Sequence, residues 1–356
     1  MVFKNIEEFK EKGKIGIVGG SGRMGQWALN LFKNLGYKNL YFSALGDSHK
    51  DVEGKTGAKF IKTNKGLAKL CDLVIISVPI SSTLKVIDEV GPHLKKRAIF
   101  SDFTSVKNEP CKRMAKYSDN AIGIHPMFKD SVKNLENKNL VITPTNPEKQ
   151  KAGTTFLKQM FREAKLKVRV LSPEVHDKIT SFNQAGVHLM FLTYGNLLKT
   201  YCRRNNLRLK DLEMLDTPNS KLMNLLLGRF LATRNYDVMW GIQNSTKESR
   251  GMRRLFLENA EKIVDILDEG DRKQFENDLE SISRKFKKAR LLIESKDSDR
   301  LIDGLRDFGT ESHFERNLLD VEGIILKTEE LLRTTGIFSL SDEKTKQVFE
   351  KVKNLF

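Results

Sequence analysis

Residues 14–25 read KIGIVGGSGRMG, an apolar run followed by a loop with glycine at positions 20, 22 and 25. The run KIGIV predicts a buried strand, and the residues after the loop begin a helix that carries Trp27, Leu29 and Phe32. In a GxGxxG loop between strand and helix, backbone N–H groups can approach a pyrophosphate, and the helix N-terminus favours its negative charge. The segment therefore predicts a dinucleotide site. The expected contacts are Gly20, Ser21, Gly22, Arg23, Met24 and Gly25.

Short apolar or β-branched runs continue beyond this loop and alternate with helical stretches, as in βαβ folds. These runs are residues 14–18, 40–43, 59–61, 73–78, 98–101, 122–124, 140–143 and 168–171. After Ser172-Pro173 the pattern changes to long segments with a 3.6-residue period. We therefore predict an α/β protein with a Rossmann-type doubly wound sheet domain over residues 1–172 and an all-helical domain over 173–290. Residues 291–356 are expected to form a helical extension of unknown role.

The helical part contains two features with structural consequences. Residues 174–203 are apolar over most of a helical circumference, so we expect one long helix buried between neighbours. Gly270-Asp271 should end one helix and cap the next. Phe275, Leu279, Ile282 and Phe286 form a seam for another helix, either of the same chain or of a second subunit. A homodimer is the expected assembly.

The composition fits a globular protein with ordinary cores. The 356 residues are 39% hydrophobic and 30% charged, and a chain of this length usually forms two domains. The net charge of +16 raises the question of nucleic acid, but the lysines are mixed with acidic residues along the chain, which indicates a solvated surface. The longest apolar run is too short to span a membrane, so we expect a cytoplasmic protein. The three widely spaced cysteines predict neither disulfides nor a metal site.

The residue that ends the second strand bears on the choice of cofactor. NAD-binding folds usually place a carboxylate there, and this chain has Ser43. A serine hydroxyl could bind a 2′-phosphate with His49 and Lys50 as nearby cations, which favours NADP over NAD. Asp47 leaves NAD open.

Two later segments carry candidate chemistry, SDFTSVK at residues 101–107 and GIHPMF at 123–128. If strands end at Asp102 and Pro126, they deliver Ser105 and His125 to one edge of a parallel sheet, where doubly wound folds bind ligands. The pKa of histidine lies near neutrality, which suits the removal of a hydroxyl proton. A histidine with a purely structural role is the alternative.

Polar residues in the helical part point to substrate binding. Thr180, Gln184 and His188 follow one another at helical spacing on an otherwise apolar segment, which favours a polar ligand or an internal hydrogen-bond network. Arg229 lies on the apolar face of its helix, where a guanidinium requires an anion. This anion could also be a carboxylate of the protein itself.

The glycine loop, SDFTSVK, GIHPMF, PEVHDKITSFNQAGVH at residues 173–188 and Gly228-Arg229 together resemble the prephenate dehydrogenase family of tyrosine biosynthesis. The resemblance implies that His125 accepts the proton of the substrate's ring hydroxyl while hydride leaves for a nicotinamide, and that Ser105 bonds the same hydroxyl. It also implies that Gln184 and His188 border the substrate, that Arg229 binds a substrate carboxylate, and that His176 caps or orients rather than reacts. Further implied cofactor contacts are Ser77, Val78, Pro79 and Thr83.

The chain departs from the family at two places. The usual HPMFGP reads HPMFKD here, with Lys129 and Asp130, and Gly241 replaces an aspartate of relatives after Arg229. Loop shape and substrate preference could therefore differ.

The resemblance predicts oxidative decarboxylation of prephenate with NAD(P)⁺ to 4-hydroxyphenylpyruvate. Arogenate dehydrogenase, with the same chemistry, is an alternative. A β-hydroxyacid dehydrogenase would need a lysine on the interdomain helix, and none occurs between Lys178 and Lys199. A non-catalytic dinucleotide sensor is the alternative from another class.

Overall fold

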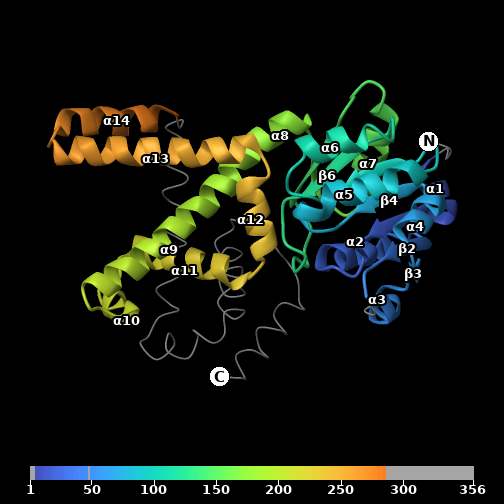
Figure 1. Cartoon of the computed structure of the whole chain (residues 1–356), viewed down its shortest axis with the longest axis horizontal. Helices are drawn as coiled ribbons and strands as arrows, with labels where there is room; N and C mark the ends of the chain where they lie inside the picture. The colour runs from blue at the N-terminus through green and yellow to red at the C-terminus, as the bar shows by residue number, and fades with distance from the viewer. Residues whose placement is uncertain (1–4, 47–48, 286–356) are drawn as a thin grey trace. The chain divides into compact units, whose positions relative to one another are not determined.

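The computed structural model describes residues 5–46 and 49–285 of the chain (Figure 1). Two compact units are formed. Of the described residues, the first contains 5–46, 49–185 and 236–252, and the second contains 186–235 and 253–285. The first unit therefore extends past the expected boundary at 172/173 and also takes up a later segment of the chain.

The first unit is built on a parallel sheet with the strand order β3-β2-β1-β4-β5. These strands are β1 (Lys14–Val18), β2 (Asn39–Ser43), β3 (Lys59–Phe60), β4 (Leu73–Ile76) and β5 (Ile99–Asp102). The connecting helices are α2 (Arg23–Asn34), α3 (His49–Thr56), α4 (Asn64–Leu70) and α5 (Ile80–Val90), followed by the short 3₁₀ turn η1 (Gly91–His93). This order is that of a Rossmann-type fold, which confirms the predicted fold class.

A second sheet contains β6 (Ile122–Pro126), β7 (Asn139–Pro144) and β8 (Lys167–Val170). Strand β6 follows β5 in parallel, because Phe100 pairs with Ala121 and the Ser101 hydroxyl donates to the Ile122 carbonyl at 2.6 Å. Strand β7 then runs antiparallel to β6 and parallel to β8. Each strand expected from the sequence is present, and β7 departs from the parallel arrangement of the first sheet.

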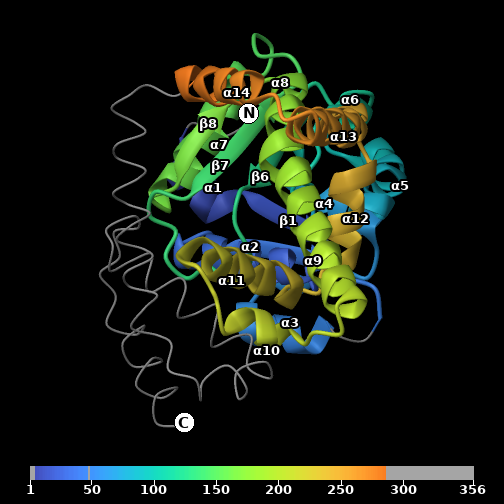
Figure 2. The ribbon, with the colours of Figure 1, turned by 90° about the vertical axis from the view of Figure 1, so that its left-hand side faces the viewer.

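The core of this unit lies on both faces of the first sheet, because successive strand residues point to opposite sides. Ile17 and Ile75 belong to one buried cluster, and Val74 and Ile76 belong to the other. Helices also cover both sides. The remaining ones in this part of the chain are α1 (Ile6–Lys12), α6 (Asn108–Met114) and α7 (Lys151–Glu163), of which α7 lies across β7 and β8 (Figure 2).

The segment expected to be one long buried helix is interrupted. It forms α8 (Pro173–Thr180), a π-helical turn (Ser181–Gly186) and α9 (Val187–Arg204). The side chains of Phe182 and Leu197 are 62% and 61% exposed, so the expectation of burial was wrong. The π turn is held from another element, since Gln243 Nε2 donates to the Ala185 carbonyl at 2.7 Å.

Further helices complete the described part of the chain: α10 (Leu209–Glu213), α11 (Pro218–Ala232), α12 (Tyr236–Asn244), α13 (Lys247–Asp268) and α14 (Arg272–Lys285). The expected stop and cap between α13 and α14 are confirmed, because Gly270 has φ +68° and Asp271 Oδ1 accepts from Gln274 N at 2.9 Å. Leu279 and Ile282 of the expected seam are exposed, whereas Phe286 and the extension over 291–356 lie outside the described residues.

None of the helices within residues 5–46 and 49–285 is long and apolar enough to cross a membrane.

Helix α12 packs on α5 within the first unit, and this contact requires Gly241. A Cβ at Gly241 would lie 2.7 Å from Ile80 Cδ1 and 3.0 Å from Ile80 Cβ. An aspartate at position 241, which the family resemblance would lead one to expect, would therefore collide with α5. The departure at Gly241 is consistent with close packing of α12 against α5.

We predict that Gly241→Ala lowers the free energy of unfolding, although alanine favours a helix over glycine by about 1 kcal/mol, because overpacking costs about 1–3 kcal/mol. The matched control is Gly251→Ala in α13, where a Cβ meets nothing within 4 Å, so this change should stabilise the protein. Urea unfolding of the two variants measures the difference. Equal stabilisation by both changes would contradict the packing argument.

Candidate active site

The glycine loop joins β1 to α2 and has the geometry of an anion cradle. Gly19 has φ +81°, and a Cβ there would collide with the carbonyl oxygen of Ser77. A Cβ on Gly25 would lie 2.6 Å from the Gly19 carbonyl oxygen. Helix α2 begins at Arg23 behind Gly22, and no side chain caps its N-terminus. The backbone N–H groups at the start of α2 and the helix dipole favour a phosphate group. The loop therefore fits the pyrophosphate of a dinucleotide.

Two expected cofactor contacts have partners inside the protein. The Ser43 hydroxyl is buried and donates to Asn64 Oδ1 at 2.7 Å, while its carbonyl accepts from the N–H groups of Gly19 and Gly20. The Thr83 hydroxyl is also buried and donates to the Pro79 carbonyl at 3.1 Å. Ser43 therefore holds the glycine loop through its carbonyl. Its hydroxyl is bonded to Asn64 and not to a 2′-phosphate.

The residues expected to supply positive charge near this strand differ in their surroundings. The ring of His49 stacks on Phe60 with centroids 4.3 Å apart, and Lys50 is exposed. Asp47, the residue that left NAD open, lies outside the described residues.

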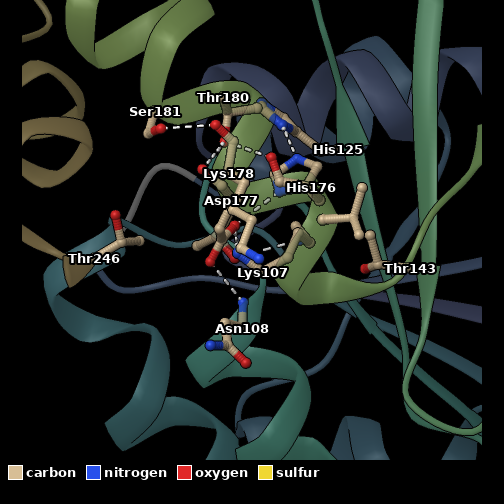
Figure 3. A network of polar contacts seen from close by, with 12 residues as sticks. Lys107, Asn108, His125, Thr143, His176, Asp177, Lys178, Thr180, Ser181 and Thr246 are labelled. Carbon is tan, nitrogen blue, oxygen red and sulfur yellow. Dashed lines mark hydrogen bonds and ion pairs between the residues drawn. The ribbon is translucent and has the colours of Figure 1, made fainter. Parts of the chain in front are cut away.

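His125 lies near the end of β6 and is only 3% exposed. Its Nδ1 is 2.8 Å from Nε2 of His176, and Nδ1 of His176 is 2.8 Å from Oδ1 of Asp177 (Figure 3). His176 and Asp177 come from α8, about fifty residues along the chain, and both are buried. The His176 ring contacts His125 of β6. The three side chains thus form one continuous row of hydrogen bonds.

Asp177 also fixes the loop that carries Ser105. Its Oδ1 accepts from Lys107 N at 2.8 Å, and its Oδ2 accepts from Asn108 N at 2.9 Å (Figure 3). Ser105 is half-buried in this loop, between the end of β5 and Lys107. Since β5 and β6 run side by side in parallel, Ser105 and His125 follow neighbouring strands at the same edge, as the sequence predicts.

Lys107 is fully buried and forms an ion pair with Asp102 at 2.5 Å. Its ammonium also donates to the Asp102 carbonyl at 3.3 Å and to the Thr104 hydroxyl at 3.5 Å. A buried ammonium requires such partners because its desolvation is costly. The ammonium of Lys107 is close enough to His125 and His176 to lower the pKa of both.

These surroundings keep both imidazoles uncharged. Burial lowers the pKa of His125 well below its ordinary value of 6.5, and the nearby His176 and Lys107 lower it further. Burial also lowers the pKa of His176, in opposition to the hydrogen bond from its ring to Asp177. A neutral imidazole has a lone pair, so His125 can act as a proton acceptor at neutral pH.

Aromatic contacts join the glycine-loop helix to the loops beyond β5 and β6. The ring of Trp27 in α2 meets Phe103 edge-on at 6.0 Å and Phe128 at 5.3 Å. Arg23 Nε lies 4.0 Å from Asp130 Oδ1, so one of the two residues that depart from HPMFGP lies beside the glycine loop. These contacts fix the position of α2 relative to the strand that carries His125.

The expected substrate residues are distributed over both units. Gln184 is half-buried in the π turn of the first unit. His188 and Arg229 belong to the second unit, in which α9 packs on α11 and the His188 ring lies 5.0 Å from the Phe230 ring. Arg229 is half-buried on α11. A π-helical turn over Ser181–Gly186 lies within the segment that carries Thr180, Gln184 and His188. Their common polar stripe stays a prediction.

Sequence reasoning missed Lys107 and Asp177 and saw only an orienting role for His176. The available signal was an ionisable residue next to each motif, namely Lys107 at the end of SDFTSVK and Asp177 after His176. Their importance comes from contacts that no local pattern contains.

Known proteins resemble this chain in sequence. Residues 32–170 match the family described as prephenate dehydrogenase, nucleotide-binding domain. A probable arogenate/prephenate dehydrogenase of Methanocaldococcus jannaschii is 28% identical over 275 residues, which are 76% of this chain and 60% of that protein. These comparisons show that the chain is similar to proteins of the prephenate and arogenate dehydrogenase family.

Other members of the family have similar sequences or folds. The T-protein of Haemophilus influenzae is 29% identical over 221 residues, 62% of this chain and 53% of that protein, so the chain spans little more than half the length of these curated relatives. The crystal structure of prephenate dehydrogenase from A. aeolicus with hydroxyphenyl propionate and NAD⁺ has a TM-score of 0.59 at 16% identity and covers 77% of this chain and 96% of that one. Synechocystis arogenate dehydrogenase has a TM-score of 0.59 at 17% identity, with coverage of 76% and 98%. Both show the same fold.

The lowered pKa of His125 predicts how stability depends on pH. Below pH 6.5 an unfolded histidine takes up a proton, whereas the buried His125 does not, so stability falls with pH from 6.5 toward the native pKa. The slope for one such proton is about 1.4 kcal/mol per pH unit.

We predict that His125→Asn removes the part of the fall in unfolding free energy at low pH that comes from His125. The difference in unfolding free energy between the natural protein and the variant should shrink as the pH falls from 7.5 to 5.5. Urea unfolding across this range measures it, and carboxylates common to both proteins cancel. A difference that stays constant with pH would contradict a neutral, buried His125.

Proposed function

We propose that this protein oxidises prephenate with NAD(P)⁺ and releases 4-hydroxyphenylpyruvate, CO₂ and NAD(P)H. The observation that carries the proposal is His125, which is buried near the end of β6 with its Nδ1 against His176, at the sheet edge that also bears the glycine loop. Burial lowers the pKa of His125, which favours the neutral ring. A neutral imidazole in this place is what proton removal from a ring hydroxyl requires. The similarity to prephenate and arogenate dehydrogenases supports the same chemistry.

His125 accepts the proton of the ring hydroxyl at Nε2, since its Nδ1 is engaged with His176. Ser105 bonds the same hydroxyl and positions it. NAD(P)⁺, when bound, accepts the hydride that leaves the hydroxyl-bearing carbon. The bond to the ring carboxylate breaks, its electron pair enters the ring, and the ring becomes aromatic. The proton returns from His125 to oxygen as the phenol forms, so no proton is consumed overall.

The glycine loop would hold the pyrophosphate, through the free N–H groups at the start of α2 and with the backbone of Ser77, Val78 and Pro79 beside it. The engaged Ser43 hydroxyl leaves His49 and Lys50 as the support for a 2′-phosphate. NADP⁺ is the expected preference, on the strength of these two residues. NAD⁺ is the alternative.

Arg229 and His188 are proposed to bind carboxylate groups of the substrate, and Gln184 to bond a polar group beside them. The packing of α9 on α11 brings the His188 ring against Phe230, the neighbour of Arg229. A guanidinium binds a carboxylate with two parallel hydrogen bonds, which suits a dicarboxylate substrate.

Arogenate is the second candidate substrate. It carries an amino group where prephenate has a keto group, and the hydroxyl that faces the base is the same in both. The name of the M. jannaschii relative includes both activities. A homodimer is also proposed, because exposed apolar side chains such as Leu279 and Ile282 line α14.

The assay follows the absorbance of reduced cofactor with prephenate or arogenate against NAD⁺ or NADP⁺, in all four combinations. We predict turnover with prephenate, faster with NADP⁺ than with NAD⁺. His125→Asn should lower kcat by about 10²–10⁴-fold while the affinity for cofactor is kept, since the residue acts on a proton and does not hold the dinucleotide.

A matched control is His93→Asn, which changes a histidine in the turn after α5. Cofactor binding without turnover in any combination would contradict the proposed reaction and would favour a dinucleotide sensor. Full activity of His125→Asn would remove that residue from its role.

A further inference from the structure

His176 uses both of its ring nitrogens inside the protein. One faces Nδ1 of His125 and the other faces Oδ1 of Asp177, each at 2.8 Å (Figure 3). His125, His176 and Asp177 are 3%, 1% and 2% exposed, so water cannot replace these bonds easily. The row therefore determines which nitrogens carry hydrogen.

The direction of each bond follows from Asp177. An ionised carboxylate only accepts, and Asp177 already accepts from the N–H groups of Lys107 and Asn108. The hydrogen between Asp177 and His176 must therefore be on Nδ1 of His176. In the neutral ring, Nε2 of His176 is then an acceptor, and the hydrogen between the two histidines is on Nδ1 of His125. Neutral His125 keeps its lone pair on Nε2.

The charges around the two rings favour the neutral tautomers before the reaction. They also stabilise the imidazolium that forms after proton transfer. Asp102 compensates part of the charge of Lys107 in their ion pair, and the carboxylate of Asp177 is in direct contact with the row. A proton taken up by the two rings forms an imidazolium, and its positive charge is then balanced by Asp177 through His176. No bond of the row has to break.

We propose that His176 and Asp177 are positioning residues of the reaction. They hold His125 in the tautomer with a free Nε2 and share the positive charge that arrives with the substrate's proton. In the proposed step the substrate O–H bond breaks, a bond forms from hydrogen to Nε2 of His125, and Nδ1–H of His125 continues to donate to Nε2 of His176. This inference rests on the proposed function for its catalytic part only.

The tautomer can be measured without substrate. In the full-length protein labelled with ¹⁵N-histidine, two-dimensional NMR distinguishes ring nitrogens that carry hydrogen from those that do not. We expect Nδ1 of His125 and Nδ1 of His176 to carry hydrogen at pH 7.5 and both Nε2 atoms to carry none. Assignment uses His125→Asn and His176→Gln. Hydrogen on Nε2 of His125 would overturn the inference.

Kinetics test the consequence with a graded set of variants. His176→Gln keeps an acceptor near the former Nε2 position, and His176→Leu removes it. We expect kcat to fall about 100-fold or more for leucine and less than about tenfold for glutamine, with KM for cofactor changed less than about threefold. The control is Lys178→Gln, whose side chain is exposed on the same helix. A kcat for His176→Leu equal to that of Lys178→Gln would overturn the inference.

A double variant separates positioning from mere structural support. In Asp177→Asn an amide nitrogen at the position of Oδ1 can donate to Nδ1 of His176, which reverses the row and puts hydrogen on Nε2 of His125, but it loses the bond from Lys107 N. A comparable change in a Ser-His-Asp triad lowers kcat by about 10⁴-fold through the wrong tautomer. Adding His176→Gln removes the reversed imidazole, so we expect the double variant to be more active than Asp177→Asn alone. A double variant that is equally or less active would contradict the positioning role.

Failure of the inference and failure of the proposed function give different results. If the natural protein turns over neither prephenate nor arogenate, the function fails, while the NMR result still decides the tautomer. If the natural protein is active and His125→Asn is not, but His176→Leu matches the Lys178→Gln control, the function stands and the inference fails.

Discussion

The carboxylate of Asp177 is the interaction on which the site depends. It accepts hydrogen bonds from the backbone of Lys107 and Asn108 and contacts the ring of His176, which in turn contacts His125. One side chain of α8 thereby fixes the Ser105 loop, the start of α6 and the imidazole on β6. Bonds to a buried ionised group are stronger than those between neutral groups, and a lost partner is costly. The geometry of the base is therefore coupled to the packing of α8.

The buried Lys107–Asp102 pair sets the electrostatics of the same region. Such a pair contributes little net stability, because desolvation offsets the attraction between the charges. The role of the pair lies in its position. The Lys107 ammonium lowers the pKa of His125, and Lys107 lies in the same loop as Ser105. The fold thus supplies an uncharged base in a place that carries several buried charges.

Local sequence patterns predicted the strands, the glycine loop, and the delivery of Ser105 and His125 to one sheet edge, because each depends on neighbours in the chain. The contact between Lys107 and Asp177 joins residues 70 positions apart, and no local period encodes it. The π turn and the inclusion of α12 in the first unit were missed for the same reason. Both depend on Gln243 and Gly241, whose partners are Ala185 and Ile80. The burial of α9 and the π turn was predicted from their apolar residues alone. Composition cannot distinguish an internal contact from an exposed apolar surface.

The most direct test of the account is a crystal structure of the full chain with the oxidised cofactor and 4-hydroxyphenylpyruvate. The account predicts the product hydroxyl within hydrogen-bond distance, about 2.6–3.2 Å, of both Nε2 of His125 and the Ser105 hydroxyl. It also predicts the pyrophosphate at the start of α2 and an unbroken row from His125 through His176 to Asp177. A bound product whose hydroxyl faces other groups, with His125 turned away from it, would contradict the central role of this histidine.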